Sequence, residues 1–173
     1  MKNIAIFASG AGTNAESIAL HFADNQMAEV VLIVSNKKTA GVMKRAEKLR
    51  IDHIFVDKKN LNNCDFLLQE LKKYEIDLIV LAGFLALIPS KIVHTYKTRI
   101  INIHPALLPK YGGKGMYGDK VHKAVLQNKE TESGISIHYV NEIYDEGNII
   151  LQARCPVYSN DTPETLGARI HKL

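Results

Sequence analysis

The sequence predicts an α/β fold of the Rossmann-like type. We expect a mostly parallel sheet with helices on both faces and an antiparallel hairpin towards the C-terminus. Two observations indicate this fold. Short apolar runs alternate with segments of helical periodicity along most of the chain, as in right-handed β-α-β units. Beyond roughly residue 130, two apolar runs follow each other with no helical segment between them, which predicts the hairpin.

The elements are expected in the following order. Parallel strands are expected at the apolar runs Asn3–Ser9, Val30–Ser35, His53–Val56, Leu78–Ala82 and Ile100–Ile103. Helices are expected at residues 15–22, Gly41–Arg50 and Cys64–Tyr74, after Pro89, at Asp119–Gln127 and from Thr162 to Leu173. The hairpin strands are Ser133–Val140 and Asn148–Val157. Pro89 and Pro163 both suit the first turn of a helix, where a missing N–H costs little.

Length and composition limit the class of protein. The 173 residues suit a single domain, 1–173, with no linker or internal repeat. The net charge of +4 is scattered, so it favours an anionic ligand only weakly and does not indicate a nucleic-acid partner. No apolar run approaches the ~20 residues of a membrane span, and the start does not resemble a signal peptide. Cys64 and Cys155 lie far apart in sequence, so we expect free thiols in a reducing cytoplasm.

The expected strand before Pro105 carries two polar side chains in an apolar run. Asn102 and His104 are two positions apart, so they share one face of the strand. Pro105 cannot donate to a ladder, so the strand should end there. Ligands bind at this carboxyl end in open α/β sheets. Taken alone, Asn102 and His104 are slightly better explained as hydrogen-bonded core residues than as part of a ligand site. The stretches described next favour the ligand site.

The loop Ser9–Asn14, with the sequence Ser-Gly-Ala-Gly-Thr-Asn, joins the first strand to a helix. Glycines let a ligand approach the backbone, and the free N–H groups of a helix N-terminus attract an anion. The loop therefore predicts a phosphate site, with a simple tight turn as the alternative. Its candidate residues are Gly12, Thr13 and Asn14. The loop also matches the dinucleotide pattern GxGxxA, but no acidic residue follows about 20 positions later. Lys37 and Lys38 stand there instead, so an NADP-binding module stays open.

Two more stretches are candidates for a site. The apolar loop Leu81–Ile88 can line a pocket for a flat heterocycle, or it can simply pack in the core. The loop Asn141–Gly147 carries three acidic residues, one of which can turn towards His104 and raise its pKa. His138, in the preceding strand, is either a second imidazole of the site or a core residue. The seven histidines show no metal-binding spacing, so no metal is expected.

Together these stretches resemble the folate-dependent formyltransferases, and among them the phosphoribosylglycinamide formyltransferase family of purine (IMP) biosynthesis. The resemblance covers essentially the whole chain and is carried by Ser9–Asn14, Leu81–Phe84, Asn102–Pro109, Gly134–His138 and Asp145–Gln152. It implies transfer of a formyl group from 10-formyltetrahydrofolate to the amine of glycinamide ribonucleotide. Both substrates are small molecules, and the transfer is direct, with no covalent enzyme intermediate.

The resemblance also implies the roles of individual residues. It makes Asn102, His104 and Asp145 catalytic and places the substrate phosphate on Gly12, Thr13 and Asn14. It places the folate against Leu85, Ala86, Leu87, Ile88, Asn141 and Tyr144. In that reaction Asn102 orients the developing oxyanion, a protonated His104 donates to it, and the Asp145–His104 pair transfers the proton. Family members usually continue beyond the position that matches residue 173. The resemblance therefore leaves open that this chain is a C-terminally shortened form, whose ribonucleotide pocket would be incomplete.

Three alternatives remain from the sequence. Methionyl-tRNA formyltransferase would add a second, basic domain, and formyltetrahydrofolate deformylase would normally add an N-terminal regulatory domain. Neither domain is visible in this sequence. An NADP- or nucleotide-binding Rossmann module belongs to a different class and would not require the polar pair Asn102 and His104. We expect a monomer or homodimer with no membrane partner.

Overall fold

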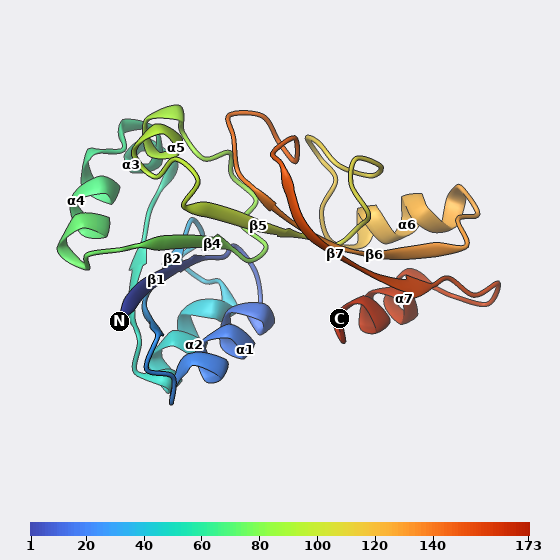
Figure 1. Cartoon of the computed structure of the whole chain (residues 1–173), viewed down its shortest axis with the longest axis horizontal. Coiled ribbons are helices and arrows are strands. Elements are labelled where there is room, and N and C mark those ends of the chain that lie inside the picture. The colour runs from blue at the N-terminus through green and yellow to red at the C-terminus, as the bar shows by residue number, and fades with distance from the viewer. The chain divides into compact units, whose positions relative to one another are not determined.

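Seven strands and seven helices make up the chain, and the computed structural model describes all 173 residues (Figure 1). The strands are β1 (Lys2–Phe7), β2 (Ala28–Ser35), β3 (Asp52–Phe55), β4 (Leu78–Leu81), β5 (Ile100–His104), β6 (Glu132–Tyr139) and β7 (Ile149–Pro156). The helices are α1 (Thr13–Phe22), α2 (Gly41–Leu49), α3 (Lys58–Asn63), α4 (Asp65–Lys73), α5 (Ser90–Thr95), α6 (Asp119–Gln127) and α7 (Pro163–Ile170). The chain divides into two compact units, Met1–Ile101 and Asn102–Leu173.

The strands are hydrogen-bonded in the order β3-β2-β1-β4-β5-β6-β7. In the first unit β1 pairs in parallel with β2 and β4, and β2 pairs in parallel with β3. The chain first moves outwards from β1 to β3 and then returns to β4. Right-handed crossovers therefore put α1 and α2 on one face of these strands and α3, α4 and α5 on the other (Figure 1). Strands β1, β2 and β4 are largely buried on both faces, as their continuous apolar runs require, whereas the edge strand β3 is partly exposed.

The second unit contains the antiparallel pair of the fold. Strand β6 pairs with β7 from Glu132 opposite Pro156 to His138 opposite Ile149, and β7 is the outer strand of the sheet. Helices α6 and α7 pack against each other, and a buried cluster joins them to β7 through Val125, Cys155, Leu166 and Ile170. The mixed sheet confirms the predicted fold class, with its mostly parallel strands and C-terminal hairpin.

Three local features differ from the sequence-based expectation. Helix α3 was not expected, because its six residues KKNLNN contain one apolar residue and therefore no period. It begins where the Asp57 side chain accepts a hydrogen bond from the Asn60 N–H. Pro89 is the N-cap of α5 and not part of its first turn, because its ψ of 143° is extended. Helix α7 ends at Ile170, and Lys172 and Leu173 close tighter turns behind it.

Two further observations concern expectations from composition. Both cysteines are free and buried. None of the helices combines the length and the apolarity that crossing a membrane requires. The expectation of one domain over residues 1–173 stays a prediction.

Candidate active site

His104 ends strand β5 with 3% of its surface exposed. Its Nε2 lies 2.8 Å from the Tyr111 carbonyl oxygen. Because a carbonyl can only accept, Nε2 must carry a proton. In the neutral imidazole Nδ1 therefore holds a lone pair, and this atom lies 3.6 Å from Oδ2 of Asp145. Pro105 follows directly, and the strand ends before it, as expected from its missing N–H.

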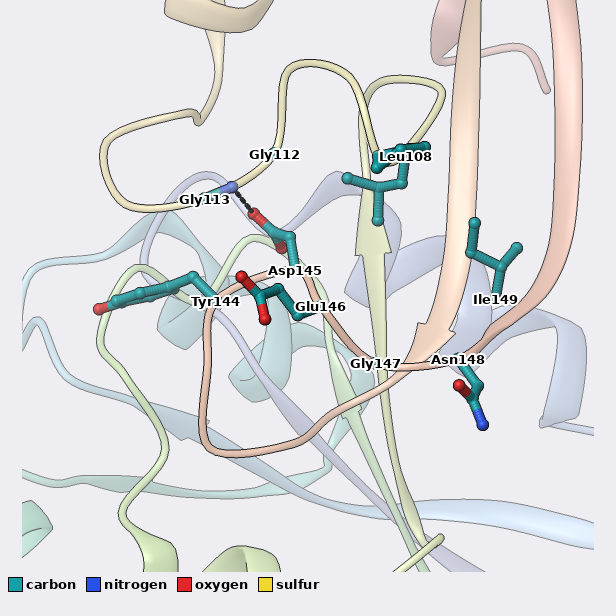
Figure 2. Close-up of a pocket in the computed structure, with 10 residues that line it drawn as sticks. Leu108, Gly112, Gly113, Tyr144, Asp145, Glu146, Gly147, Asn148 and Ile149 are labelled. Atoms are coloured by element: carbon teal, nitrogen blue, oxygen red, sulfur yellow. Dashed lines mark hydrogen bonds between the residues drawn. The ribbon is translucent and has the colours of Figure 1, made fainter.

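Asp145 belongs to the loop between β6 and β7 and turns its carboxylate inwards. Its Oδ2 accepts a hydrogen bond from the Gly113 N–H over 2.8 Å, as Figure 2 shows. Its Oδ1 accepts one from Nδ2 of Asn102 over 3.2 Å. Asn102, His104 and Asp145 therefore lie together within the second unit, although more than 40 residues separate Asn102 from Asp145.

His138 completes this group from strand β6. Its Nδ1 lies 2.9 Å from the Tyr139 carbonyl oxygen, so Nδ1 carries the proton in the neutral ring. Its Nε2 can then accept from Asn102 Nδ2, which is 3.0 Å away. Both hydrogens of the Asn102 amide are engaged in this way, one by His138 and one by Asp145. The two histidines of the site are thus held in opposite tautomers.

The charges of the site differ from the sequence-based expectation at one residue. Burial lowers the pKa of His104, and it outweighs the opposing effect of the Asp145 carboxylate and the Tyr111 carbonyl. Burial would raise the pKa of Asp145, but the contacts with His138 and His104 and the Gly113 N–H together lower it. The expected rise in the pKa of His104 is therefore wrong, because desolvation dominates. At neutral pH a neutral imidazole faces an ionised carboxylate.

A pocket of about 580 Å³ opens beside Asp145. Figure 2 shows the residues that line it, which come from the loop after β5, the β6–β7 loop and the start of β7. The full set is Leu108, Pro109, Gly112, Gly113, Tyr144, Asp145, Glu146, Gly147, Asn148 and Ile149. Of the residues expected to bind folate, Tyr144 lines this pocket. Asn141 does not line it, and its Oδ1 accepts a hydrogen bond from the Ile143 N–H within the same loop.

The remaining residues expected to bind folate belong to the first unit. They follow β4 at residues 85–88, where Leu85 and Leu87 are exposed and Ile88 is buried. The Leu85 N–H donates to the Ser9 hydroxyl over 2.9 Å, which ties this stretch to the end of β1. The exposed leucines leave an apolar surface that can contact a ligand.

The expected phosphate loop lies at the start of α1. Gly12 is the N-cap with a φ of 79°, and no side chain caps the first N–H groups of the helix. A Cβ at Gly12 would lie 2.5 Å from Val42, so the loop sits closely against α2. Arg45 holds it there, with Nε donating to the Ala11 carbonyl over 2.8 Å and an ion pair to Glu16. The loop is therefore ordered by protein contacts, while the helix end beyond it has no side-chain cap.

Sequence reasoning missed the main-chain groups of this site. The Tyr111 carbonyl and the Gly113 N–H hold His104 and Asp145, but no side-chain pattern marks a backbone contact. Ser136 and Gln152, which bind the segment after His104, were also missed. Their signal was a serine and a glutamine on facing positions of two apolar strands. No group of three or more His, Cys, Asp or Glu residues is arranged to hold a metal ion.

Comparison with known proteins places the chain in a class. The family described as formyl transferase matches residues 2–173. The Arabidopsis thaliana protein named phosphoribosylglycinamide formyltransferase, chloroplastic, is 44% identical over 182 residues, with 99% of this chain and 62% of that protein covered. This chain therefore spans less than two thirds of the plant protein's length.

Two further relatives are covered over most of their length. The Bacillus subtilis phosphoribosylglycinamide formyltransferase is 37% identical over 178 residues, covering 100% of this chain and 89% of that protein. The crystal structure of the enzyme of the same name from Anaplasma phagocytophilum has a TM-score of 0.90 at 31% identity, covering 99% of this chain and 80% of that one. The chain belongs to the formyl transferase family and, within it, to the phosphoribosylglycinamide formyltransferases.

Proposed function

We propose that the chain transfers the formyl group of 10-formyltetrahydrofolate to the amine of glycinamide ribonucleotide, a step of purine (IMP) biosynthesis. Family membership implies a folate-derived formyl donor. The observation that carries the proposal is the convergence of Asn102 and His104 on Asp145, which itself lines a pocket. The reaction needs a proton acceptor and a donor to the developing oxyanion, and these residue types supply both.

The His104–Asp145 pair handles the proton. The neutral Nδ1 of His104 and the ionised Oδ2 of Asp145 face each other over 3.6 Å, and both are acceptors. When the amine attacks the formyl carbon, its nitrogen becomes acidic and loses a proton to this pair. The bond from the formyl carbon to the folate nitrogen then breaks, and the same proton passes to that nitrogen. In this scheme His104 is a proton acceptor and not the expected protonated oxyanion donor, because burial lowers its pKa and its Nε2–H is bound to Tyr111.

In this scheme the Asn102 amide donates a hydrogen bond to the developing oxyanion. In the free protein both of its amide hydrogens are engaged, and the bond to Asp145 is the longer of the two at 3.2 Å. A proton on the carboxylate weakens Asp145 as an acceptor, which frees that hydrogen for the formyl oxygen. Proton uptake and oxyanion binding would therefore occur together. His138 supports Asn102 by accepting its other hydrogen.

The substrate-binding residues keep the roles that the resemblance implies. The phosphate of glycinamide ribonucleotide would bind the N–H groups and side chains of Gly12, Thr13 and Asn14, where no side chain caps the helix. The folate would contact Leu85, Ala86, Leu87, Ile88, Asn141 and Tyr144. The proposal also includes a cytoplasmic monomer or homodimer, although the Arabidopsis relative is named chloroplastic.

Formyl transfer itself tests the proposal. Purified chain is mixed with 10-formyltetrahydrofolate and glycinamide ribonucleotide, and the absorbance change on release of tetrahydrofolate is followed. We expect turnover that requires both substrates. Release of formate without ribonucleotide would support the deformylase alternative. NADPH binding without folate binding, measured by fluorescence titration, would support the binding module and contradict the proposal.

A further inference from the structure

A buried polar pair lies behind the segment that joins β5 to the glycine-rich loop. Ser136 on β6 has no exposed surface, and it stands opposite Gln152, which is half-buried on β7. The chemistry proposed above uses neither side chain. Buried polar groups are costly unless they are hydrogen-bonded, so their partners indicate what they do.

The partners of this pair are the main-chain groups of residues 106–108. The Ser136 hydroxyl donates to the Ala106 carbonyl over 2.7 Å and accepts from the Leu108 N–H over 2.9 Å. Nε2 of Gln152 donates to the Leu108 carbonyl over 3.0 Å and to the Ser136 hydroxyl over 2.8 Å. The hydroxyl uses its one hydrogen and both lone pairs, and the amide uses both hydrogens. The segment therefore cannot shift without breaking several bonds.

Three residues further along, the same backbone holds His104. The Tyr111 carbonyl accepts the Nε2–H of His104, and Tyr111 has a φ of 58°, a left-handed conformation that is uncommon for residues with side chains. The side chain of the same residue is also bound, because the Tyr111 hydroxyl donates to Oε1 of Glu130 over 2.8 Å. The carbonyl is thus held between the Ser136–Gln152 pair on one side and Glu130 on the other.

We propose that Gln152 is a positioning residue. Acting through Ser136 and the backbone of residues 106–111, it keeps neutral His104 in the Nε2–H tautomer, so that Nδ1 faces Asp145. The other tautomer would point a lone pair at the Tyr111 carbonyl and a hydrogen at Asp145, and His104 could then no longer accept the substrate proton. This inference rests on the proposed function and deepens it. The titratable groups that act on the His104 ring are Asp145 from the β6–β7 loop, His138 from β6 and His122 from α6.

The test reads the tautomer directly. Imidazole nitrogen NMR spectra are recorded on ligand-free, 15N-labelled chain at about pH 8, above the ordinary histidine pKa. We expect the Nε2–H form for His104 and the Nδ1–H form for His138, which serves as the internal reference. In Gln152→Leu the Nδ1–H form of His104 should appear, and kcat should fall about 10- to 100-fold with both KM values unchanged, as for a small misplacement of a reacting group.

Two variants make the test specific. Gln152→Glu keeps the length of the side chain but loses its donors, and we expect it to reproduce the effect of Gln152→Leu. Gln127→Leu, at an exposed position at the end of α6, should change neither the tautomer nor kcat. Wild-type His104 in the Nδ1–H form would overturn the proposal. So would a folded Gln152 variant with the wild-type tautomer, whatever its kcat. Absence of formyl transfer in the wild type would refute the proposed function, while the tautomer comparison would still decide the positioning.

Discussion

Burial decides the charge of His104 more than its neighbouring carboxylate does. With 3% of its surface exposed, the ring loses most of the hydration that would stabilise its charged form. Its pKa falls, although Asp145 lies 3.6 Å from Nδ1. A neutral ring whose Nε2–H is already bound can accept a proton only at Nδ1. In the proposed reaction Nδ1 takes up a proton only when the amine attacks, so His104 acts in the transition state and not in substrate binding.

Removing His104 or Asn102 should therefore affect turnover and not binding. For His104→Ala and for Asn102→Ala we expect kcat and kcat/KM to fall together by about 10²-fold or more, with KM for the ribonucleotide nearly unchanged. Thr13→Ala should do the opposite and raise this KM with little change in kcat, because phosphate is bound equally in ground and transition states. Steady-state kinetics on the three variants make the comparison.

Melting curves recorded beside the kinetics distinguish a catalytic role of Asn102 and His104 from a purely structural one. If Asn102 and His104 only satisfied buried groups, their loss would cost ~1–3 kcal/mol of stability and leave turnover per folded molecule near normal. His21→Ala, an exposed position on α1, is the control for both measurements. A large fall in melting temperature with normal specific activity would remove His104 and Asn102 from the mechanism.

The side-chain part of this site could be anticipated from sequence, and the main-chain part could not. Asn102 and His104 interrupt an apolar strand at alternate positions, which places both on one face because a strand has a period of two, and the neighbouring stretches made a site the better interpretation. The Tyr111 carbonyl and Gly113 N–H have no pattern, since every residue carries such groups. The lowered pKa of His104 depends on how deeply the ring is buried, which the sequence does not show.

At the scale of elements, the phosphate loop depends on the fit between α1 and α2. An alanine at Gly12 would require an unfavourable φ of 79° and would place its Cβ 2.5 Å from Val42. We expect Gly12→Ala to lower the free energy of unfolding by ~1–3 kcal/mol, as overpacking does. Gly10→Ala meets no atom within 4 Å and is the matched control for stability. Equal denaturant midpoints for the two variants would show that the loop is not packed as described.

Helix α7 is held at its start by one carboxylate. Asp161 has 3% of its side chain exposed and accepts two hydrogen bonds from the Arg169 guanidinium at 2.6 and 2.8 Å. It also accepts from the Tyr158 N–H and the Thr165 hydroxyl, both over 2.8 Å. Hydrogen bonding to Arg169 holds the pKa of Asp161 well below its usual range. The carboxylate therefore connects the turn before α7 to the body of the helix.

Asp161→Asn should destabilise the protein without changing its chemistry. The amide keeps the shape but loses the charge and turns one N–H₂ group towards Arg169. A charge-assisted hydrogen bond contributes ~1.5–3 kcal/mol, so we expect the melting temperature to fall by several degrees. Asp24→Asn, at an exposed position, should leave it unchanged. Equal melting temperatures for the two variants would contradict the role of Asp161.

Elements with a clear period were predicted well, and short polar ones were not. Helix α6 was expected at Asp119–Gln127 and lies at those residues, because its apolar positions repeat at helical spacing. Helix α3 was not predicted because its stability comes from the Asp57 cap and from one buried residue, Leu61. Neither produces a helical period over six residues. The end of α7 was placed three residues too late, since no glycine or proline marks it in the sequence.

At the scale of the whole molecule, the titrating groups make stability depend on pH in two steps. Burial lowers the pKa of both His104 and His122 below the ordinary value. Their contribution is therefore complete above about pH 6.5 and is lost as pH falls from there through their folded-state values. The lowered pKa values of Asp145 and Asp161 add a second loss, which begins below about pH 4.

Melting temperatures measured across this range test the dependence. We expect them to fall between pH values of about 7 and 5, where only histidines change charge, and again below about 4. His122→Leu removes one buried imidazole, whose Nδ1 has no partner in the protein, and should make the first fall smaller. A melting temperature that stays constant on acidification to about pH 5 would contradict the lowered histidine pKa values.

The sequence allowed the fold class to be predicted because several independent patterns agree. Strand–helix alternation, the glycine loop after β1 and the late hairpin all indicate one fold class, which the parallel pairs and the β6–β7 hairpin confirm. The division into Met1–Ile101 and Asn102–Leu173 was not predicted, because it lies inside β5 and no linker composition marks it.

The hydrogen bond from the Gly113 N–H to Asp145 has a consequence for how such a site can diverge. A main-chain donor has no side chain to lose, so it survives substitution by any residue that keeps the loop conformation. Proline alone removes it, and the φ of 95° at this position already excludes proline. Homologues can therefore differ in the side chains at positions 114, 116 and 117 in an alignment and still hold the carboxylate, whereas the φ of 95° favours glycine at 113. In this part of the protein, sequence identity is a poor measure of shared chemistry.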